Sequence, residues 1–91
     1  MNEHSKHTTN KLIQSLDLPM DIFLGMPNFS LFGNKELYIS NHRGIIAFGE
    51  DEITILVKEY QVRIKGKELV LSNYTKEDIT INGYIHSMEF V

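Results

Sequence analysis

The chain has 91 residues, a formal net charge of −3 at pH 7 and no cysteine. This length predicts one domain, because a second hydrophobic core would need more residues. The lack of cysteine excludes disulfides and thiolate metal sites, and the mildly acidic charge gives no general attraction for nucleic acid. The longest apolar run is far shorter than the roughly 20 residues of a membrane span, and the polar start is unlike a secretory signal. We therefore expect a cytoplasmic protein, associated at most peripherally with membranes.

The N-terminal part of the sequence predicts a polar tail followed by one short helix. Residues 1–10 are mostly Asn, Ser, Thr, His and Lys, which predicts a disordered tail. Thr9 or Asn10 can cap a first helical turn, and residues 12–16 then place apolar side chains on one helical face. Such a face normally packs on its own domain, so we expect this helix to cover a sheet. The single domain is predicted to span residues 11–91.

From residue 28 onward, apolar and polar residues alternate, which predicts β-strands. Turn signals recur about every eight to twelve residues, as in antiparallel sheet proteins. The predicted strands cover residues 28–32, 35–40, 44–48, 53–58, 60–65, 68–72, 79–81 and 84–91. Gly33-Asn34 and Asn82-Gly83 are the two hairpin dipeptides, and Gly66 is expected to break one strand pattern.

The links between predicted strands are too short for parallel crossovers. The sequence therefore predicts a mainly β fold: an antiparallel meander bent into a small sandwich or open barrel, with one short N-terminal amphipathic helix. A short-rung β-solenoid is the competing architecture, but the sequence has no repeat of fixed period.

The tetrapeptide Asn41-His42-Arg43-Gly44 interrupts two predicted strands and has two interpretations. Asn and Gly tolerate unusual backbone angles, so the simpler interpretation is a tight turn from which Arg43 projects into solvent. In the functional interpretation, His42 and Arg43 bind an anion or move a proton. We favour the turn, because the spacing fixes no nucleophile or carboxylate beside these residues.

The sequence has no motif of a known catalytic or cofactor site. It has no nucleophile elbow, no H-E-x-x-H pair and no glycine-rich phosphate loop. His86 and Ser87 are adjacent in a predicted strand, so they point to opposite faces and cannot act as a nucleophile–base pair. His4 and His7 have a chelating spacing but no further ligands nearby. We expect no enzyme activity, no cofactor and no metal.

Charged residues mark a candidate interaction surface. Arg63, Lys65 and Lys67 alternate along an extended strand and so share one face, unless Gly66 shifts the register. The simpler interpretation is a solvated face whose lysines discourage aggregation. The alternative is a cationic strip that docks on an acidic partner or on anionic lipid. The acidic cluster comprises Glu50, Asp51 and Glu52. It could bind this strip on a neighbouring copy and assemble chains head to tail.

Three segments resemble the YabP/YqfC family of sporulation proteins: SLFGNKELYISNHRGIIAFGEDEITI, VRIKGKELVL and ITINGYIHSMEF. The YqfC type is the most similar, and the LDLPMDIFLGMP segment is also similar to that type. The likeness spans residues 11–91. Its recurring positions are largely turn positions: Gly33, Asn34, Asn41, His42, Gly44, Gly66 and Lys67. The chain departs from the family pattern at His86, where relatives commonly carry an acidic residue, so no ionic contact of the last strand is carried over.

The resemblance implies a non-enzymatic protein of endospore-forming bacteria, made during sporulation and needed to complete the spore. It also implies a larger membrane-anchored sporulation protein (YqfD-like) as the partner. We therefore expect a structural or assembly role, peripheral at the membranes around the developing spore. In the mechanism that we expect, an exposed edge strand at residues 84–90 pairs with this partner or with another copy. A proline at Ile85 or Ser87 would then abolish pairing.

The alternative is a small lipid- or ligand-binding module of the pleckstrin-homology or GRAM kind, which uses the strip near Arg63 to contact lipid. Such modules end in a helix that packs across the barrel. The final residues of this chain predict a strand instead.

Overall fold

The computed structural model of the chain describes residues 24–91, which form six β-strands. The strands are β1 (Asn28–Phe32), β2 (Glu36–Ser40), β3 (Gly44–Phe48), β4 (Glu52–Leu56), β5 (Gln61–Tyr74) and β6 (Asp78–Phe90). All neighbouring strands are antiparallel, which confirms the mainly β, antiparallel prediction. The predicted tail and the predicted N-terminal helix lie outside the described residues.

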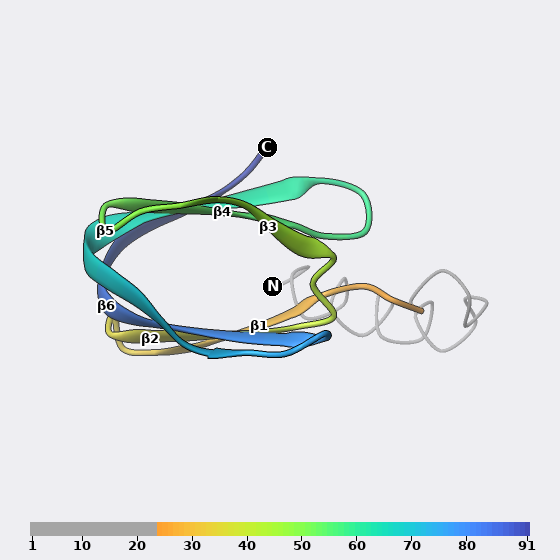
Figure 1. Ribbon diagram of the computed structural model, residues 1–91, viewed down its shortest axis with the longest axis horizontal. Coiled ribbons are helices and arrows are strands. Elements are labelled where there is room, and N and C mark those ends of the chain that lie inside the picture. The colour runs from red at the N-terminus through yellow and green to blue at the C-terminus, as the bar shows by residue number, and fades with distance from the viewer. Residues whose placement is uncertain (1–23) are drawn as a thin grey trace, which may run out of the picture.

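The six strands form one sheet in the order β1-β2-β6-β5-β4-β3. This sheet is folded over so that two halves face each other (Figure 1). The first half contains β1, β2, the start of β6 and the end of β5, and the second half contains β3, β4, the start of β5 and the end of β6. The two long strands therefore belong to both halves.

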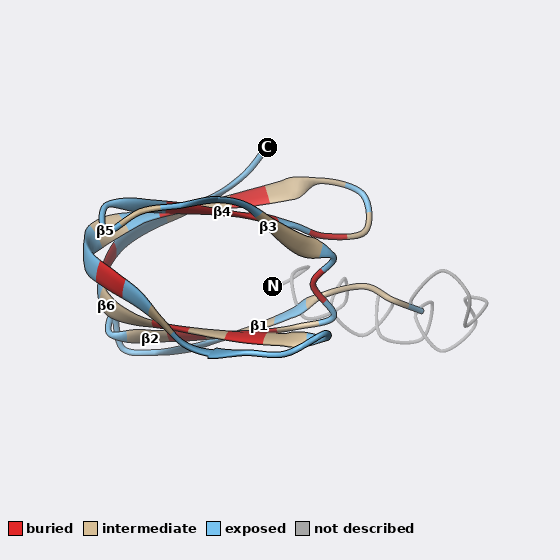
Figure 2. Cartoon of the chain, in the orientation of Figure 1, coloured by how far each residue is buried: buried red, intermediate tan, exposed pale blue. Residues whose placement is uncertain are grey.

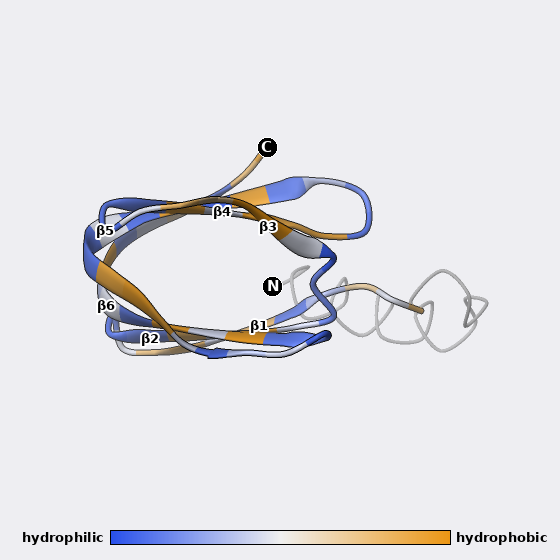
Figure 3. Cartoon of the chain, in the orientation of Figure 1, coloured by the Kyte–Doolittle hydropathy of each residue, from blue (hydrophilic) through white to orange (hydrophobic). Residues whose placement is uncertain are grey.

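The core fills the space between the halves, because alternating residues of each strand point inward. Leu37 and Ile39 of β2 pair with Ile81 and Ile79 of β6 in the first half. The buried side chains form one cluster: Leu37, Ile39, Ile53, Ile55, Val57, Val62, Ile64, Leu69, Ile79, Ile81 and Ile85. Figure 2 shows these buried stretches, and Figure 3 shows that they coincide with the apolar stretches of the strands.

The predicted meander is wrong at one connection. β2 pairs with β6 rather than with β3, and β3 lies at the far edge of the sheet. Residues 41–43 carry the chain from the first half to the second (Figure 1). This order differs from a meander because the inward residues of β2, Leu37 and Ile39, lie beside Ile81 and Ile79 on β6. These partners come some forty positions later in the chain.

One of the two predicted hairpin dipeptides does not form a hairpin. Gly33-Asn34 does lie in the β1–β2 hairpin, but Asn82-Gly83 lies inside β6. The β5–β6 hairpin uses residues 75–77 instead, where the Thr75 hydroxyl accepts a hydrogen bond from the Asp78 amide at 2.9 Å. This side-chain-to-backbone bond is typical of a turn that begins at Thr.

Asn82-Gly83 and Gly66 are residues typical of turns, and they occur here because β5 and β6 bend at these positions. Gly66 does not end a strand, since β5 continues to Tyr74 through register shifts. Glu68 has a φ of 56° and Gly83 a φ of 142° at this bend. A Cβ atom on Gly83 would lie 2.6 Å from the Glu68 carbonyl oxygen, and one on Gly66 would overlap the Tyr84 carbonyl. Glycine is therefore required where the two strands press together.

Candidate functional site

The crossover connection, residues 41–44, is held by backbone and side-chain hydrogen bonds from several parts of the chain. The His42 amide donates to the Glu77 carbonyl at 3.2 Å, and the Arg43 amide donates to the Leu56 carbonyl at 2.7 Å. Asn41 has a φ of 64°, and its amide group donates to the Met26 carbonyl at 3.0 Å. The connection is therefore fixed at both halves of the sheet and at the segment that precedes β1.

His42 is buried in this connection, with 6% of its surface exposed. Its Nε2 lies 2.8 Å from the Thr75 carbonyl oxygen, which can only accept, so Nε2 donates. The ring also packs against Tyr74, with ring centroids 5.4 Å apart. Nδ1 has no hydrogen-bond partner within residues 24–91. The imidazole thus ties the crossover to the β5–β6 hairpin and keeps one polar atom unused.

Arg43 is exposed, as the turn interpretation predicts, but the connection is not a hairpin. Two adjoining hollows, of about 450 and 330 Å³, share His42, Arg43 and Lys76 in their walls. The functional interpretation paired His42 with Arg43; the structure adds Lys76, which stands at the tip of the β5–β6 hairpin. Lys76 was missed because it is far from residues 41–44 in the sequence and only the sheet order brings it there.

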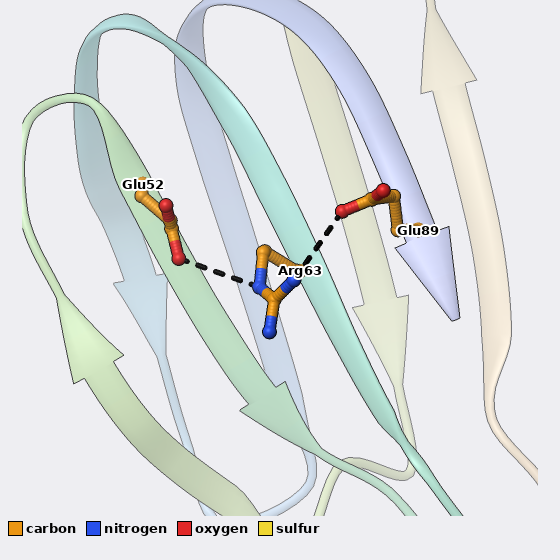
Figure 4. Close-up of polar contacts among 3 residues, drawn as sticks. All are labelled: Glu52, Arg63 and Glu89. Atoms are coloured by element: carbon orange, nitrogen blue, oxygen red, sulfur yellow. Dashed lines mark ion pairs between the residues drawn. The ribbon is translucent and has the colours of Figure 1, made fainter. Parts of the chain in front are cut away.

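The residues of the predicted cationic strip lie in different surroundings. Arg63 forms ion pairs with Glu52 on β4 at 3.4 Å and with Glu89 on β6 at 3.5 Å (Figure 4). Lys65 is exposed further along β5, and register shifts follow between Lys65 and Gly66 and again beyond Lys67. The guanidinium of Arg63 is therefore neutralised within the chain, which leaves less charge for a neighbouring copy.

The predicted acidic cluster forms the β3–β4 turn and contacts the bend of β5. The Glu50 carbonyl accepts from the Leu69 amide, and the Asp51 carbonyl accepts from the Gly66 amide, both at 2.9 Å. The Glu52 carboxylate faces Arg63. The backbone of this cluster thus has a structural role in the chain, and one of its three side chains already has a cationic partner.

The end of β6 is an open sheet edge. Gln61 and Val91 exchange both backbone hydrogen bonds, and the register from Val62–Phe90 to Lys65–Ser87 is unbroken. In an antiparallel ladder such pairs alternate, so the N–H and C=O groups of Met88 and Phe90 point away from β5. No other strand among residues 24–91 pairs with them. The sequence predicted an exposed edge strand over residues 84–90. This holds only for residues 88–90, the open edge, because β6 otherwise lies between β2 and β5 and the Ile85 amide is bonded within the fold.

The register also corrects the two proline positions. The Ile85 amide donates to the Asn34 carbonyl at 2.8 Å, and the Ser87 amide faces β5 by the same alternation. Proline at either position would remove a hydrogen bond within the fold. His86 is exposed and lies where β5 and β6 shift register, between Ser87 and Ile85.

The described residues contain no group of three or more His, Asp or Glu side chains arranged to hold a metal ion. Residues 24–91 also contain no helix of the length and apolar character that crossing a bilayer requires. His4 and His7 lie outside the described residues.

Comparison with known proteins places this sheet in a family. The sequence model of the YabP family matches residues 25–91, which include all six strands. The chain belongs to the YabP/YqfC family. It is 32% identical over 80 residues to YqfC of Bacillus subtilis (strain 168), a protein described as uncharacterized, and the match covers 88% of this chain and 86% of that protein. No solved structure matches the chain. The predicted family resemblance is therefore confirmed.

Proposed function

We propose that this YabP/YqfC-family protein is a non-enzymatic assembly component in endospore formation, and that its open edge on β6 pairs with a strand of another chain. The observation that carries the proposal is the outward direction of the Met88 and Phe90 backbone groups. Unpaired N–H and C=O groups along a strand are a template for a further strand.

Side chains at this edge favour pairing as well. Phe90 is 62% exposed and Val91 55% exposed, although both are large and apolar. Phe90 is held in place by an edge-on contact with Tyr60, at 5.4 Å between ring centroids, and by Phe29 at 5.9 Å. An aromatic ring that is positioned by neighbours but still exposed loses little conformational freedom on binding. Main-chain bonds would thus provide affinity, and Phe90 would add buried apolar area.

β3, an outer strand of the sheet, supports this role less well than the end of β6. It carries a register shift between Ile45 and Ala47, and a bulge of this kind turns an edge away from new partners. The last part of β6 combines an unbroken register with exposed apolar side chains, so it is better suited to strand addition than β3.

We infer that the strand added to this edge comes from a membrane-anchored sporulation protein (YqfD-like) or from a second copy of the chain. The family name supports a sporulation context, and pairing with an anchored partner would hold this protein peripherally at the membranes around the developing spore. The alternative, a pleckstrin-homology or GRAM-like module that contacts lipid through the strip near Arg63, has less support, because Arg63 already forms ion pairs with Glu52 and Glu89.

The test compares Phe90→Pro with Phe90→Ala. Both variants remove the exposed ring, but only proline removes the outward N–H, so the difference between them isolates main-chain pairing. The measurement is light scattering of each variant, alone and with the soluble region of the membrane-anchored partner. We expect the alanine variant to retain association and the proline variant to lose it.

The control is circular dichroism, which should show that both Phe90 variants remain folded. If the folded proline variant associates as well as the alanine variant, or if the wild-type protein associates with neither itself nor the partner, strand addition at this edge is wrong.

A further inference from the structure

The two hollows beside the crossover connection, here called the crossover hollow, are lined by two cations, and a third lies next to the smaller hollow. Arg43 comes from the connection between β2 and β3, and Lys76 comes from the β5–β6 hairpin. Lys58 follows β4, and a Cβ on Gly25 would lie 3.2 Å from Arg43 Nη2 and 3.8 Å from Lys58 Cδ. The side chains of Arg43 and Lys58 therefore approach each other across Gly25.

These three cations have no carboxylate partner at ion-pair distance among residues 24–91. Arg63, in contrast, has two such partners. The chain as a whole carries a net charge of −3, so acidic side chains are in excess. Glu77 lines the smaller hollow but forms no ion pair there within the described part of the chain. A cluster of like charges without counter-charges raises the free energy of the fold unless an anion binds.

His42 adds an independent observation. It is more than nine-tenths buried, it lines both hollows, and its Nδ1 has no partner within residues 24–91. A buried polar atom without a hydrogen bond is unfavourable, so such an atom in a native protein calls for a ligand or another role. Nε2 already donates to the Thr75 carbonyl, so Nδ1 of that tautomer is an acceptor, which a hydroxyl group of a bound ligand could satisfy.

We propose that the crossover hollow binds a phosphate group. The planar guanidinium of Arg43 can donate two parallel hydrogen bonds to phosphate oxygens, and the Lys76 ammonium can donate to a third. Lys58 is partly engaged, because its ammonium donates to the Leu24 carbonyl at 2.8 Å, and it adds positive charge at the rim. The larger hollow, at about 450 Å³, falls within the size range of ligand pockets.

The test is a titration of the full chain with inorganic phosphate, followed by NMR of the backbone amides. We expect saturable shifts confined to residues 41–44 and 75–77. Arg43→Gln with Lys76→Gln should weaken binding by about tenfold or more, because three charge-assisted hydrogen bonds are lost. Lys65→Gln with Lys67→Gln is the matched control: it removes the same charge elsewhere and should leave the affinity within about twofold.

A second arm distinguishes a lipid headgroup from a free phosphate. The protein is sedimented with vesicles of phosphatidylcholine that do or do not contain phosphatidic acid. Binding to the phosphatidic acid vesicles that is lost in the Arg43/Lys76 variant identifies a headgroup; binding of inorganic phosphate alone identifies a free ligand. If neither probe binds, or if both variants bind equally, the proposal is overturned. The crossover hollow contains none of residues 88–90, so either result leaves strand pairing at β6 to its own test.

Discussion

The chain passes between the two halves of the sheet at two kinds of place, and these differ in how closely they are packed. At the bend of β5 and β6, the backbones touch so closely that Gly66 and Gly83 have no room for a Cβ. At the crossover connection, Gly44 has a similar φ of 146°, but no atom lies within 4 Å of where its Cβ would be. Glycine with a φ near 145° therefore lies in a closely packed contact at the bend (Gly83) and beside open space at the crossover (Gly44).

This difference indicates where the molecule can hold a ligand. The bend has its backbone groups paired through the β3–β4 turn, whose carbonyls accept from Gly66 and Leu69. At the crossover, Nδ1 of His42 has no hydrogen-bond partner among residues 24–91, and exposed cations lie around it. A sealed bend fixes the angle between the halves, whereas an open crossover leaves space beside its charged side chains. Four measurements test this difference between the bend and the crossover.

The largest effect is expected at the bend. Gly83→Ala should lower the free energy of unfolding by about 3–5 kcal/mol, since it adds both backbone strain and a clash with the Glu68 carbonyl. Gly44→Ala is the matched control with a similar φ and open space, and should lower it by only about 1–2 kcal/mol. Urea denaturation measures both. Equal losses would show that the bend is not sterically sealed.

The next effect concerns the buried imidazole. His42→Ala should lower the free energy of unfolding by about 2–3 kcal/mol, because it leaves a cavity and removes the hydrogen bond to the Thr75 carbonyl. Arg43→Ala, one residue away and exposed, should change it by no more than about 0.5 kcal/mol. Thermal unfolding of the two variants measures these changes. A larger loss of stability in Arg43→Ala than in His42→Ala would mean that the guanidinium, not the imidazole, holds the crossover in place.

A smaller effect is expected on the outer face of the second half. Arg63→Gln should lower the free energy of unfolding by about 0.5–1 kcal/mol, because its ion pairs with Glu52 and Glu89 are partly exposed. High salt should remove most of the difference between wild type and variant. Denaturation at low and high salt measures it. A loss as large as that of Gly83→Ala would mean that this face, rather than the bend, holds the halves together.

The smallest effect is expected on the outer face of the first half. The hydrogen bond to Asp78, together with partial burial and the negative charge of Asp78, raises the pKa of Tyr38 above its usual value of 10.0. Below pH 10.0 this interaction contributes to stability in full; above it, the unfolded tyrosine ionises first, so the contribution is lost as pH rises through the folded pKa. NMR titration of the Tyr38 ring should show a lower midpoint in Asp78→Asn. An unchanged midpoint would assign the shift to another cause.

The strands between residues 28 and 56 were largely predictable from residue patterns. The strand segments β1 to β4 follow the alternation of apolar residues, and Gly33-Asn34 lies in a hairpin as predicted. The prediction went wrong at Gly66 and Asn82-Gly83, where glycine signals a bend within a long strand instead of a turn between strands. Local chemistry shows only that glycine is needed; whether the chain reverses there depends on what packs against it.

For the candidate sites too, the sequence indicated individual residues but not the partners that they contact. His42 and Arg43 could be singled out from the sequence, and an exposed edge near the end of the chain could be expected. The partners of these residues could not, because Thr75 and Lys76 are more than thirty positions from residues 41–44, and Arg63 meets Glu89 only through the β5–β6 register.

The sequence alone indicated an antiparallel β structure, because alternation and short links act locally along the chain. It also carried the family likeness that comparison with known proteins confirmed. The fold in three dimensions was needed to show that β2 pairs with β6, that the sheet bends at two crowded glycines, and that a buried histidine lies beside cations without an ion pair among residues 24–91. These features depend on contacts between distant segments, and such contacts are set by how the whole core packs rather than by any local pattern.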